Sequence, residues 1–217
     1  AGIGVPVCGQ DNEVAGHALD VGGDVAGLVD DVRLNAEDDV HIVATVDDVK
    51  CDSCGICAGT CPKNAITMQG LTEDQIMAQI TALLQHAPKD GSVLAFSCAE
   101  CGFTAIDTAG MAPAEYPANV RILKVPCTGT LKVHHFLSAF KNGADAVMVV
   151  GCKTDGCHYE VGSSTAKRRV DLTKKILDLY GLGSSRLEMF HNISIEGKDF
   201  VAEANAMLKQ AQALGSI

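Results

Sequence analysis

Four cysteines within eleven residues constrain this chain more than any other feature. They are spaced C-x2-C-x2-C-x3-C and lie directly before Pro62: Cys51, Cys54, Cys57 and Cys61. Thiolates are soft ligands, and the short gaps let one loop curl around a cluster so that three sulfurs reach three irons. Gly55 allows the tight turn, and Pro62 directs the chain away after the last cysteine. The run predicts a 4Fe–4S cluster.

Two alternatives to this cluster stay open, a zinc ion and a set of disulfides. The C-x2-C pairs that bind zinc usually lie well apart in sequence, whereas here they run together. The fourth cluster ligand is open as well. In two-cluster ferredoxins the cysteine before the proline ligates the other cluster, but no second complete run follows here. We favour Cys61 because it is local, and the remote Cys8 is the alternative.

The composition is typical of a globular protein in a reducing compartment. The 217 residues are 47% hydrophobic and 20% charged, which is enough to bury a core. No apolar run reaches the length of a membrane span, and the N-terminus lacks the basic region of a secretory signal. Ten cysteines without such a signal favour metal binding in the cytoplasm over disulfides. The chain also begins without Met, so we expect a processed protein or part of a longer one.

Negative charge is concentrated in the first part of the chain. The formal net charge is −10, and residues 1–50 hold 11 acidic residues against 2 basic ones. This charge would repel phosphates, so nucleic acid is excluded as a partner. We interpret residues 1–40 as an acidic N-terminal segment with a solvated face, and a docking surface for a basic partner is the alternative.

The order of hydrophobic runs predicts an α/β fold. Residues 41–70 read as a ferredoxin-like segment, with a strand at 41–46, the cysteine loop and a return strand at 65–68. A capping box from Thr72 to Gln75 begins a connecting helix within residues 71–91. Residues 92–217 then alternate between expected strands at 92–96, 120–125, 146–150 and 187–193 and expected helices at 131–140, at 164–181 and from just after Gly197 to about 214. The alternation predicts an open, mostly parallel sheet with flanking helices, flavodoxin-like or Rossmann-like.

Five further cysteines each follow the end of a predicted strand: Cys98, Cys101, Cys127, Cys152 and Cys157. In open α/β sheets, ligands bind beyond the carboxyl ends of the strands, so these distant sulfurs should converge at one edge. Buried free cysteines are common small hydrophobic residues, but these lie in loops beside Gly and Pro. The set therefore predicts a second metal site. One thiol is surplus, because a cluster needs four ligands.

We expect Cys127, Cys152 and Cys157 to be ligands, with the fourth taken from Cys98 or Cys101. The sequence leaves that choice open, and a dithiol redox motif is an alternative for the C-x2-C pair. His158 is a candidate to orient or tune the second cluster. The remaining polar candidates are interpreted as structural or solvated: His134, His135 and Lys167 to Arg169. No catalytic triad, P-loop or complete dinucleotide fingerprint is present, so we assign no catalytic residue.

Ordered motifs extend through the second half of the chain. They include Cys98-x2-Cys101, Val125-Pro126-Cys127-Thr128-Gly129, Gly151-Cys152, Cys157-His158-Tyr159 and Ile195-Glu196-Gly197. Through these motifs, residues 92–214 resemble the delta subunit of methyl-viologen-reducing hydrogenase. The preceding 4Fe–4S segment is similar to the ferredoxin inserts in the A subunit of heterodisulfide reductase. The sequence departs from the family pattern at two places, which affects the expected partner and the expected tuning of the cluster. Thr130 stands where the family usually has Arg, and Asp155-Gly156 reverses the usual order.

This resemblance implies an iron–sulfur electron-transfer subunit whose second cluster is 2Fe–2S. It implies a link between a hydrogenase or formate dehydrogenase and a heterodisulfide reductase-type flavoprotein, within an anaerobic oxidoreductase complex. Related domains occur in quinone-interacting oxidoreductase complexes, which is one alternative. A zinc-stabilised assembly module is another, and a thiol–disulfide enzyme using Cys98 and Cys101 is a third.

Overall fold

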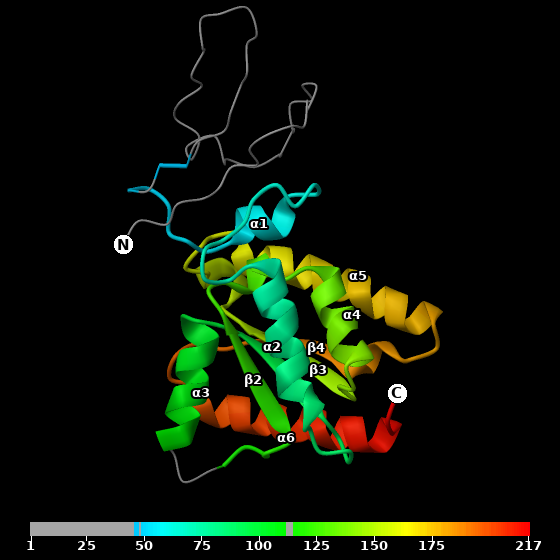
Figure 1. Ribbon diagram of the computed structural model, residues 1–217. Helices are drawn as coiled ribbons and strands as arrows, with labels where there is room; N and C mark the ends of the chain where they lie inside the picture. The colour runs from blue at the N-terminus through cyan, green and yellow to red at the C-terminus, as the bar shows by residue number, and fades with distance from the viewer. Residues whose placement is uncertain (1–45, 48, 112–114) are drawn as a thin grey trace, which may run out of the picture.

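The described part of the chain forms a parallel sheet with helices on both faces (Figure 1). The computed structural model describes residues 46, 47, 49–111 and 115–217. Neighbouring strands are parallel in the order β2-β1-β3-β4, with these bounds: β1 Val93–Cys98, β2 Val120–Val125, β3 Ala146–Gly151 and β4 Leu187–His191. The predicted α/β class with an open parallel sheet is confirmed. The acidic segment, Cys8 and the expected strand at 41–46, apart from Val46, lie outside the described residues.

Both faces of the sheet are buried, which explains why its strands read as continuous apolar runs. In β1, Leu94 and Phe96 point to one face, whereas Val93 and Ala95 point to the other. The first face is covered by α2 (Glu73–Gln85), α4 (Val133–Lys141) and α5 (Gly162–Leu179). The second face is covered by α3 (Cys101–Met111) and α6 (Gly197–Leu214). Figure 1 shows α6 lying across the sheet on the side opposite α2 and α4.

Local sequence signals predicted several helix ends to within two residues. The backbone N–H of Thr72 donates to Gln75 Oε1 (2.8 Å), and the N–H of Gln75 donates to Thr72 Oγ1 (3.3 Å). This confirms the predicted capping box at the start of α2. The last helix, α6, includes Gly197, which was expected to precede it, and ends at the predicted Leu214. Helix α5 begins two residues before the predicted Ser164, and α4 begins two residues after Leu131.

Two expectations about local structure were wrong or incomplete. Residues 65–68 form no strand, because no described strand pairs with them, and Met68 instead packs its sulfur against Gly55. Helix α3 was not predicted, because Gly102 and Gly110 lower its helix propensity and hide its periodicity. The remaining short helices are α1 Ile56–Thr60, η1 Thr128–Thr130, η2 Thr154–Gly156 and η3 Ser184–Arg186.

The strand order creates a crevice at the carboxyl end of the sheet. The connection from β1 to β2 passes through α3 on one face, whereas the connection from β3 to β4 passes through α5 on the other. Adjacent strands whose connections leave in opposite directions form a topological switch point, where α/β proteins bind ligands. Cys98 is the last residue of β1, and Cys152 directly follows β3. The switch point therefore brings two predicted site residues together.

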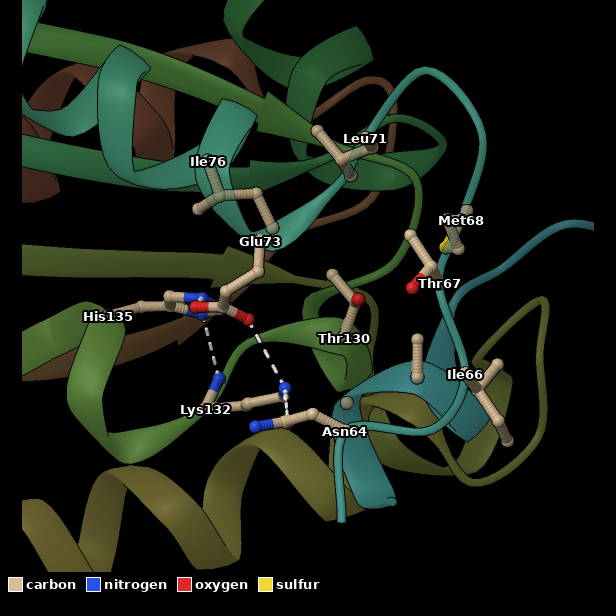
Figure 2. A pocket seen from close by; sticks show the side chains of 12 residues that line it. Asn64, Ile66, Thr67, Met68, Leu71, Glu73, Ile76, Thr130, Lys132 and His135 are labelled. Carbon is tan, nitrogen blue, oxygen red and sulfur yellow. Dashed lines mark hydrogen bonds and ion pairs between the residues drawn. The ribbon is translucent and has the colours of Figure 1, made fainter. Parts of the chain in front are cut away.

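A buried histidine connects helix α4 to helix α2 (Figure 2). The backbone N–H of Lys132 donates to His135 Nδ1 (3.0 Å), so Nε2 carries the ring proton and donates to Glu73 Oε1 (2.7 Å). Lys132 Nζ donates to Glu73 Oε2 (3.2 Å) and to Asn64 Oδ1 (2.6 Å), just beyond the cysteine loop. Because both ring nitrogens of His135 are engaged, we interpret this group as structural.

This buried histidine makes stability sensitive to mild acid. Burial lowers the pKa of His135 from 6.5 to about 4, although Glu73 opposes the shift. The unfolded chain therefore binds more protons between pH 6.5 and 4, so stability is lost as the pH falls through that window. We expect the unfolding free energy to be about 2 kcal/mol lower at pH 5 than at pH 7 from this group alone.

Denaturant unfolding of the cluster-loaded protein at both pH values tests this expectation. His135→Gln should reduce the difference between the two pH values, because glutamine does not titrate. His86→Gln is the matched control, since His86 is exposed, and it should preserve the wild-type difference. Equal pH dependence in wild type and His135→Gln would contradict the interpretation.

Candidate metal centres

The first cysteine run forms a loop around the short helix α1. Gly55 precedes this helix with φ of 78°, a left-handed conformation that favours glycine. A Cβ atom at Gly55 would lie 2.2 Å from Met68 Sδ and 2.8 Å from Thr130 Oγ1. The turn and the close approach of neighbouring chain therefore both require glycine here, as the sequence predicted.

Local contacts favour Cys61 as part of the first centre. Its Sγ accepts a hydrogen bond from the backbone N–H of Ala65 (3.3 Å), a contact of the kind that tunes cluster sulfurs. Burial raises the pKa of Cys54, and the neighbouring thiols Cys57 and Cys51 raise it further. Crowded thiols of this kind ionise together only when a cation offsets their charge, so the loop fits a metal centre.

The second set of cysteines gathers at the switch point of the sheet. Cys98 Sγ and Cys152 Sγ are 3.8 Å apart, and both residues are buried. Two sulfurs on one tetrahedral metal, each about 2.3 Å from it, would be about 3.8 Å apart. Cys101 begins α3, Cys127 precedes η1 and Cys157 follows η2. All nine described cysteines are free thiols, so none of these contacts is a disulfide.

Gly162, at the start of α5, marks where the other two thiols approach each other. A Cβ atom there would lie 2.2 Å from Cys127 Sγ and 3.5 Å from Cys157 Sγ. Cys157 therefore lies near Cys127 and also packs against the cluster of Cys98, Cys101 and Cys152. Four of these five thiols would be the terminal ligands that a 2Fe–2S cluster needs.

Backbone N–H groups point at two of these sulfurs. Gly102 donates to Cys98 Sγ (3.2 Å), and Gly129 donates to Cys127 Sγ (3.4 Å). Burial raises the pKa of Cys127 to about 12, and the Cys157 and Cys54 thiols add to the rise. The hydrogen bond from Cys98 lowers the pKa of the Cys152 thiol. Because metal ligands must be thiolates, these thiols would ionise together only with a metal ion to offset their charge.

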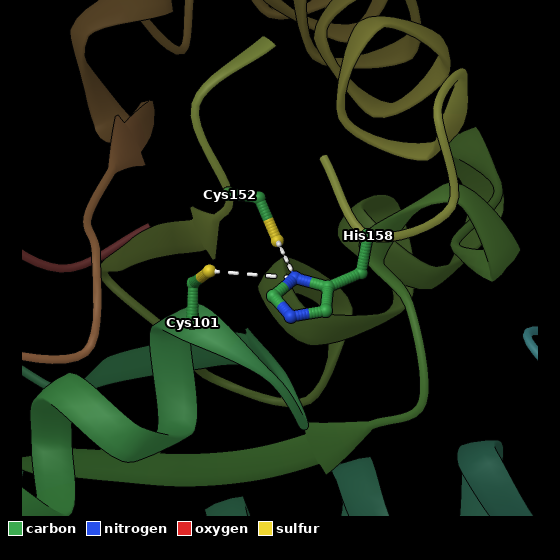
Figure 3. Close-up of side chains that lie close together, drawn as sticks. All are labelled: Cys101, Cys152 and His158. Atoms are coloured by element: carbon green, nitrogen blue, oxygen red, sulfur yellow. Dashed lines mark hydrogen bonds between the residues drawn. The ribbon is translucent and has the colours of Figure 1, made fainter. Parts of the chain in front are cut away.

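His158 lies beside this set, as Figure 3 shows. Its Nδ1 is 3.7 Å from Cys101 Sγ and 3.9 Å from Cys152 Sγ. The sequence named His158 as a candidate to orient or tune the second cluster, and the structure brings it within hydrogen-bonding reach of two of the thiols. Its role at the cluster stays a prediction.

Arg169 is the residue that sequence reasoning missed. It was interpreted as part of a solvated helix face, and this is wrong, because its guanidinium donates four hydrogen bonds to residues outside α5. Lys167 and Arg168 are exposed, as expected for such a face. Helical spacing could have indicated that Arg169, unlike Lys167 and Arg168, lies on the buried side of α5. Arg169 lies three residues after Ala166 and four before Thr173, both of which are buried.

The small cavity behind the first loop does not resemble a substrate site. Its volume is about 50 Å³, with Met68, Glu73, Thr130 and Lys132 among its lining residues (Figure 2). That space holds a few water molecules at most. Among the helices in the described ranges, none is both long and apolar enough to cross a membrane.

A parallel sheet that collects free thiols at its switch point, joined to a ferredoxin-type cysteine loop, defines an electron-transferring iron–sulfur protein. Residues 93–215 match the family described as methyl-viologen-reducing hydrogenase, delta subunit. The chain belongs to this family. Residues 50–103 match a 4Fe–4S dicluster domain, which confirms the predicted type of the first cluster.

Similar proteins fall into two groups by name, hydrogenase iron-sulfur D subunits and heterodisulfide reductase A subunits. The iron-sulfur D subunit of the F420-non-reducing hydrogenase vhu from Methanocaldococcus jannaschii is 43% identical over 126 residues, covering 58% of this chain and 94% of that protein. The A subunit of ferredoxin:CoB-CoM heterodisulfide reductase from Methanosarcina mazei is 36% identical over 153 residues, covering 70% of this chain. The matched region is only 19% of that longer protein.

Proposed function

We propose that this chain relays electrons through two iron–sulfur centres within a larger redox complex. A 4Fe–4S cluster would be held by Cys51, Cys54, Cys57 and Cys61, and a 2Fe–2S cluster by thiols at the switch point. The observation that carries the proposal is the presence of two sets of free thiols in one folded unit, one from a single loop and one from several strand ends. Iron–sulfur clusters, when bound, accept and release single electrons.

The likeness to two groups of proteins supports a role between two modules. One relative is named as the iron-sulfur subunit of a hydrogenase, and the other is named as part of a heterodisulfide reductase. The chain would therefore connect a hydrogenase or formate dehydrogenase module to a heterodisulfide reductase-type flavoprotein. Identification of the subunits in the native complex, purified without oxygen, tests this role. If the native complex contained a quinone-interacting oxidoreductase in place of these partners, the chain would serve that complex instead of linking these two modules.

For the second centre we infer that Cys98, Cys127, Cys152 and Cys157 are the ligands and that Cys101 is surplus. Cys98 and Cys127 each accept a backbone N–H, which stabilises a thiolate and tunes its cluster. Cys98 and Cys152 are spaced like two ligands of one metal. Cys101 also lies within 4.8 Å of Cys152, so the choice of Cys98 over Cys101 rests on the N–H bond that Cys98 accepts from Gly102.

A zinc-stabilised assembly module is the second candidate, and one observation favours it. The ligand atoms of Cys101, Cys152 and His158 all lie within 4.8 Å of one another, which suits a mixed sulfur and nitrogen zinc site. Zinc has no redox chemistry, so this interpretation would make the second half of the chain structural.

Metal analysis of anaerobically purified protein separates the two candidates. We expect a brown protein with roughly six irons and matching labile sulfide per chain, and two distinct EPR signals after reduction. A colourless second site that holds one zinc ion would contradict the relay. A metal-free protein that still reduces disulfides would support a thiol–disulfide enzyme instead.

A further inference from the structure

The guanidinium of Arg169 connects the two cysteine regions. On one side it donates to the backbone carbonyls of Gly129 (2.7 Å) and Leu131 (2.6 Å), just after Cys127. On the other side it donates to the carbonyl of Gly59 (2.8 Å) and to Thr60 Oγ1 (3.1 Å), just before Cys61. One side chain from α5 therefore binds both the first cysteine loop and the loop that carries Cys127.

The two loops also touch directly around this side chain. A Cβ atom at Gly59 would lie 2.5 Å from the carbonyl oxygen of Thr130, so backbone meets backbone there. A Cβ atom at Gly129 would lie 2.9 Å from Ile56 Cγ1. In Figure 1, α1 sits over the start of α5, which is the placement that these contacts require.

Ile56 of the first loop packs against the segments that surround Cys127. It precedes Cys57 in the first loop, and its Cδ1 would be 3.3 Å from a Cβ atom at Gly162. Gly162 in turn lies against Cys127 Sγ. Ile56 of the first loop and Cys127 Sγ of the second set therefore both approach Gly162.

The energetics indicate a positional role for Arg169. All four acceptors are neutral oxygens, and burial lowers the pKa of Arg169, so holding this charge here has a desolvation cost. The planar guanidinium can donate to several fixed acceptors at once, which the ammonium group of lysine cannot reproduce. Such a contact fixes geometry more than it adds stability.

We propose that Arg169 is a positioning residue that holds the first cluster loop at a fixed short distance from the second centre, so that electrons pass directly between them. In this step one electron leaves the reduced centre and enters the oxidised one, and no bond forms or breaks. The inference rests on the proposed function for the electron transfer, but the contact between the loops stands independently of it.

Arg169→Gln tests the inference, with Arg168→Gln as the matched control. Arg168 is the exposed neighbour, and its side chain donates to Thr165 Oγ1 within its own helix. In fully reduced wild type we expect EPR signals that are broadened by magnetic interaction between the two clusters. Arg169→Gln should keep the iron of both clusters but lose this interaction, whereas Arg168→Gln should retain it. Arg169→Lys should lose most of it, because lysine cannot span four acceptors.

Hydrogen exchange provides a readout that does not depend on the clusters. Backbone amides of residues 55–61 should exchange about tenfold faster in Arg169→Gln than in wild type, because the loop opens more often. Wild-type protein without two clusters would refute the proposed function while leaving the exchange test intact. If Arg169→Gln does not fold, Thr60→Val removes a single exposed acceptor and should accelerate exchange in the same residues. Unchanged exchange in the folded variant, or unchanged cluster interaction, would overturn the proposal.

Discussion

Cys54→Ala should remove the 4Fe–4S cluster and leave the second centre in place. Cys54 lies in the middle of the first loop, where burial and the neighbouring thiols make an uncompensated thiolate costly. Alanine removes one of the four sulfurs that the cluster needs, so iron should fall by about four atoms per chain. The second set of thiols comes from the strand ends of the sheet, whose packing does not include this side chain.

Iron counting combined with EPR of the reduced protein measures this result. Simultaneous loss of both EPR signals in Cys54→Ala would contradict two separate centres. A paired comparison identifies the fourth ligand. Cys61→Ser should lose the 4Fe–4S signal, because Cys61 already accepts an N–H bond from Ala65, whereas Cys8→Ser should keep it. The opposite pattern would assign the ligand role to Cys8.

Cys127→Ala and Cys152→Ala should each abolish the second centre. Cys152 directly follows the central strand β3, and Cys127 follows the edge strand β2 after Pro126, so the strand register places both. Losing either one leaves three of the four inferred ligands. Iron and labile sulfide per chain should fall by about two atoms each, with the 4Fe–4S signal unchanged.

Cys101→Ala is the matched control among the five thiols. This cysteine begins α3 and is in contact with the His158 ring, and it also lies near Cys152. The variant should keep its second cluster but show a shifted reduction potential, because a neighbouring polar group tunes the cluster sulfurs. A full second cluster in Cys127→Ala or Cys152→Ala would refute convergence at the strand ends. Loss of the cluster in Cys101→Ala would transfer the ligand role from Cys98 to Cys101.

Features that depend on neighbouring residues were the most predictable from sequence. The capping box at Thr72 and the end of α6 at Leu214 follow from short-range rules, and the structure has both. Helix α3 follows no such rule, because its two glycines weaken the local signal. The return strand at 65–68 was inferred from an expected partner, and strand formation depends on a partner being present.

The site was predictable in outline but not in detail. The rule for parallel sheets placed five thiols at one edge, and the structure gathers them there. The pairing of Cys98 with Cys152 joins residues 54 positions apart, so it depends on strand order, which the sequence did not determine. The role of Arg169 could not be predicted from the sequence for the same reason. Its acceptors lie in two distant segments that only the folded chain brings together.

The contrast between a local and a dispersed set of thiols has a consequence for how the protein matures. The first four cysteines need only short loops to close around iron, so the entropy cost of gathering them is small even in a newly made chain. The other set meets only after β1, β2 and β3 have paired, since each of these strands delivers one of its thiols. Metallation should therefore be sequential. Iron in the second centre would then mark a chain whose sheet has already formed, whereas iron in the first would not.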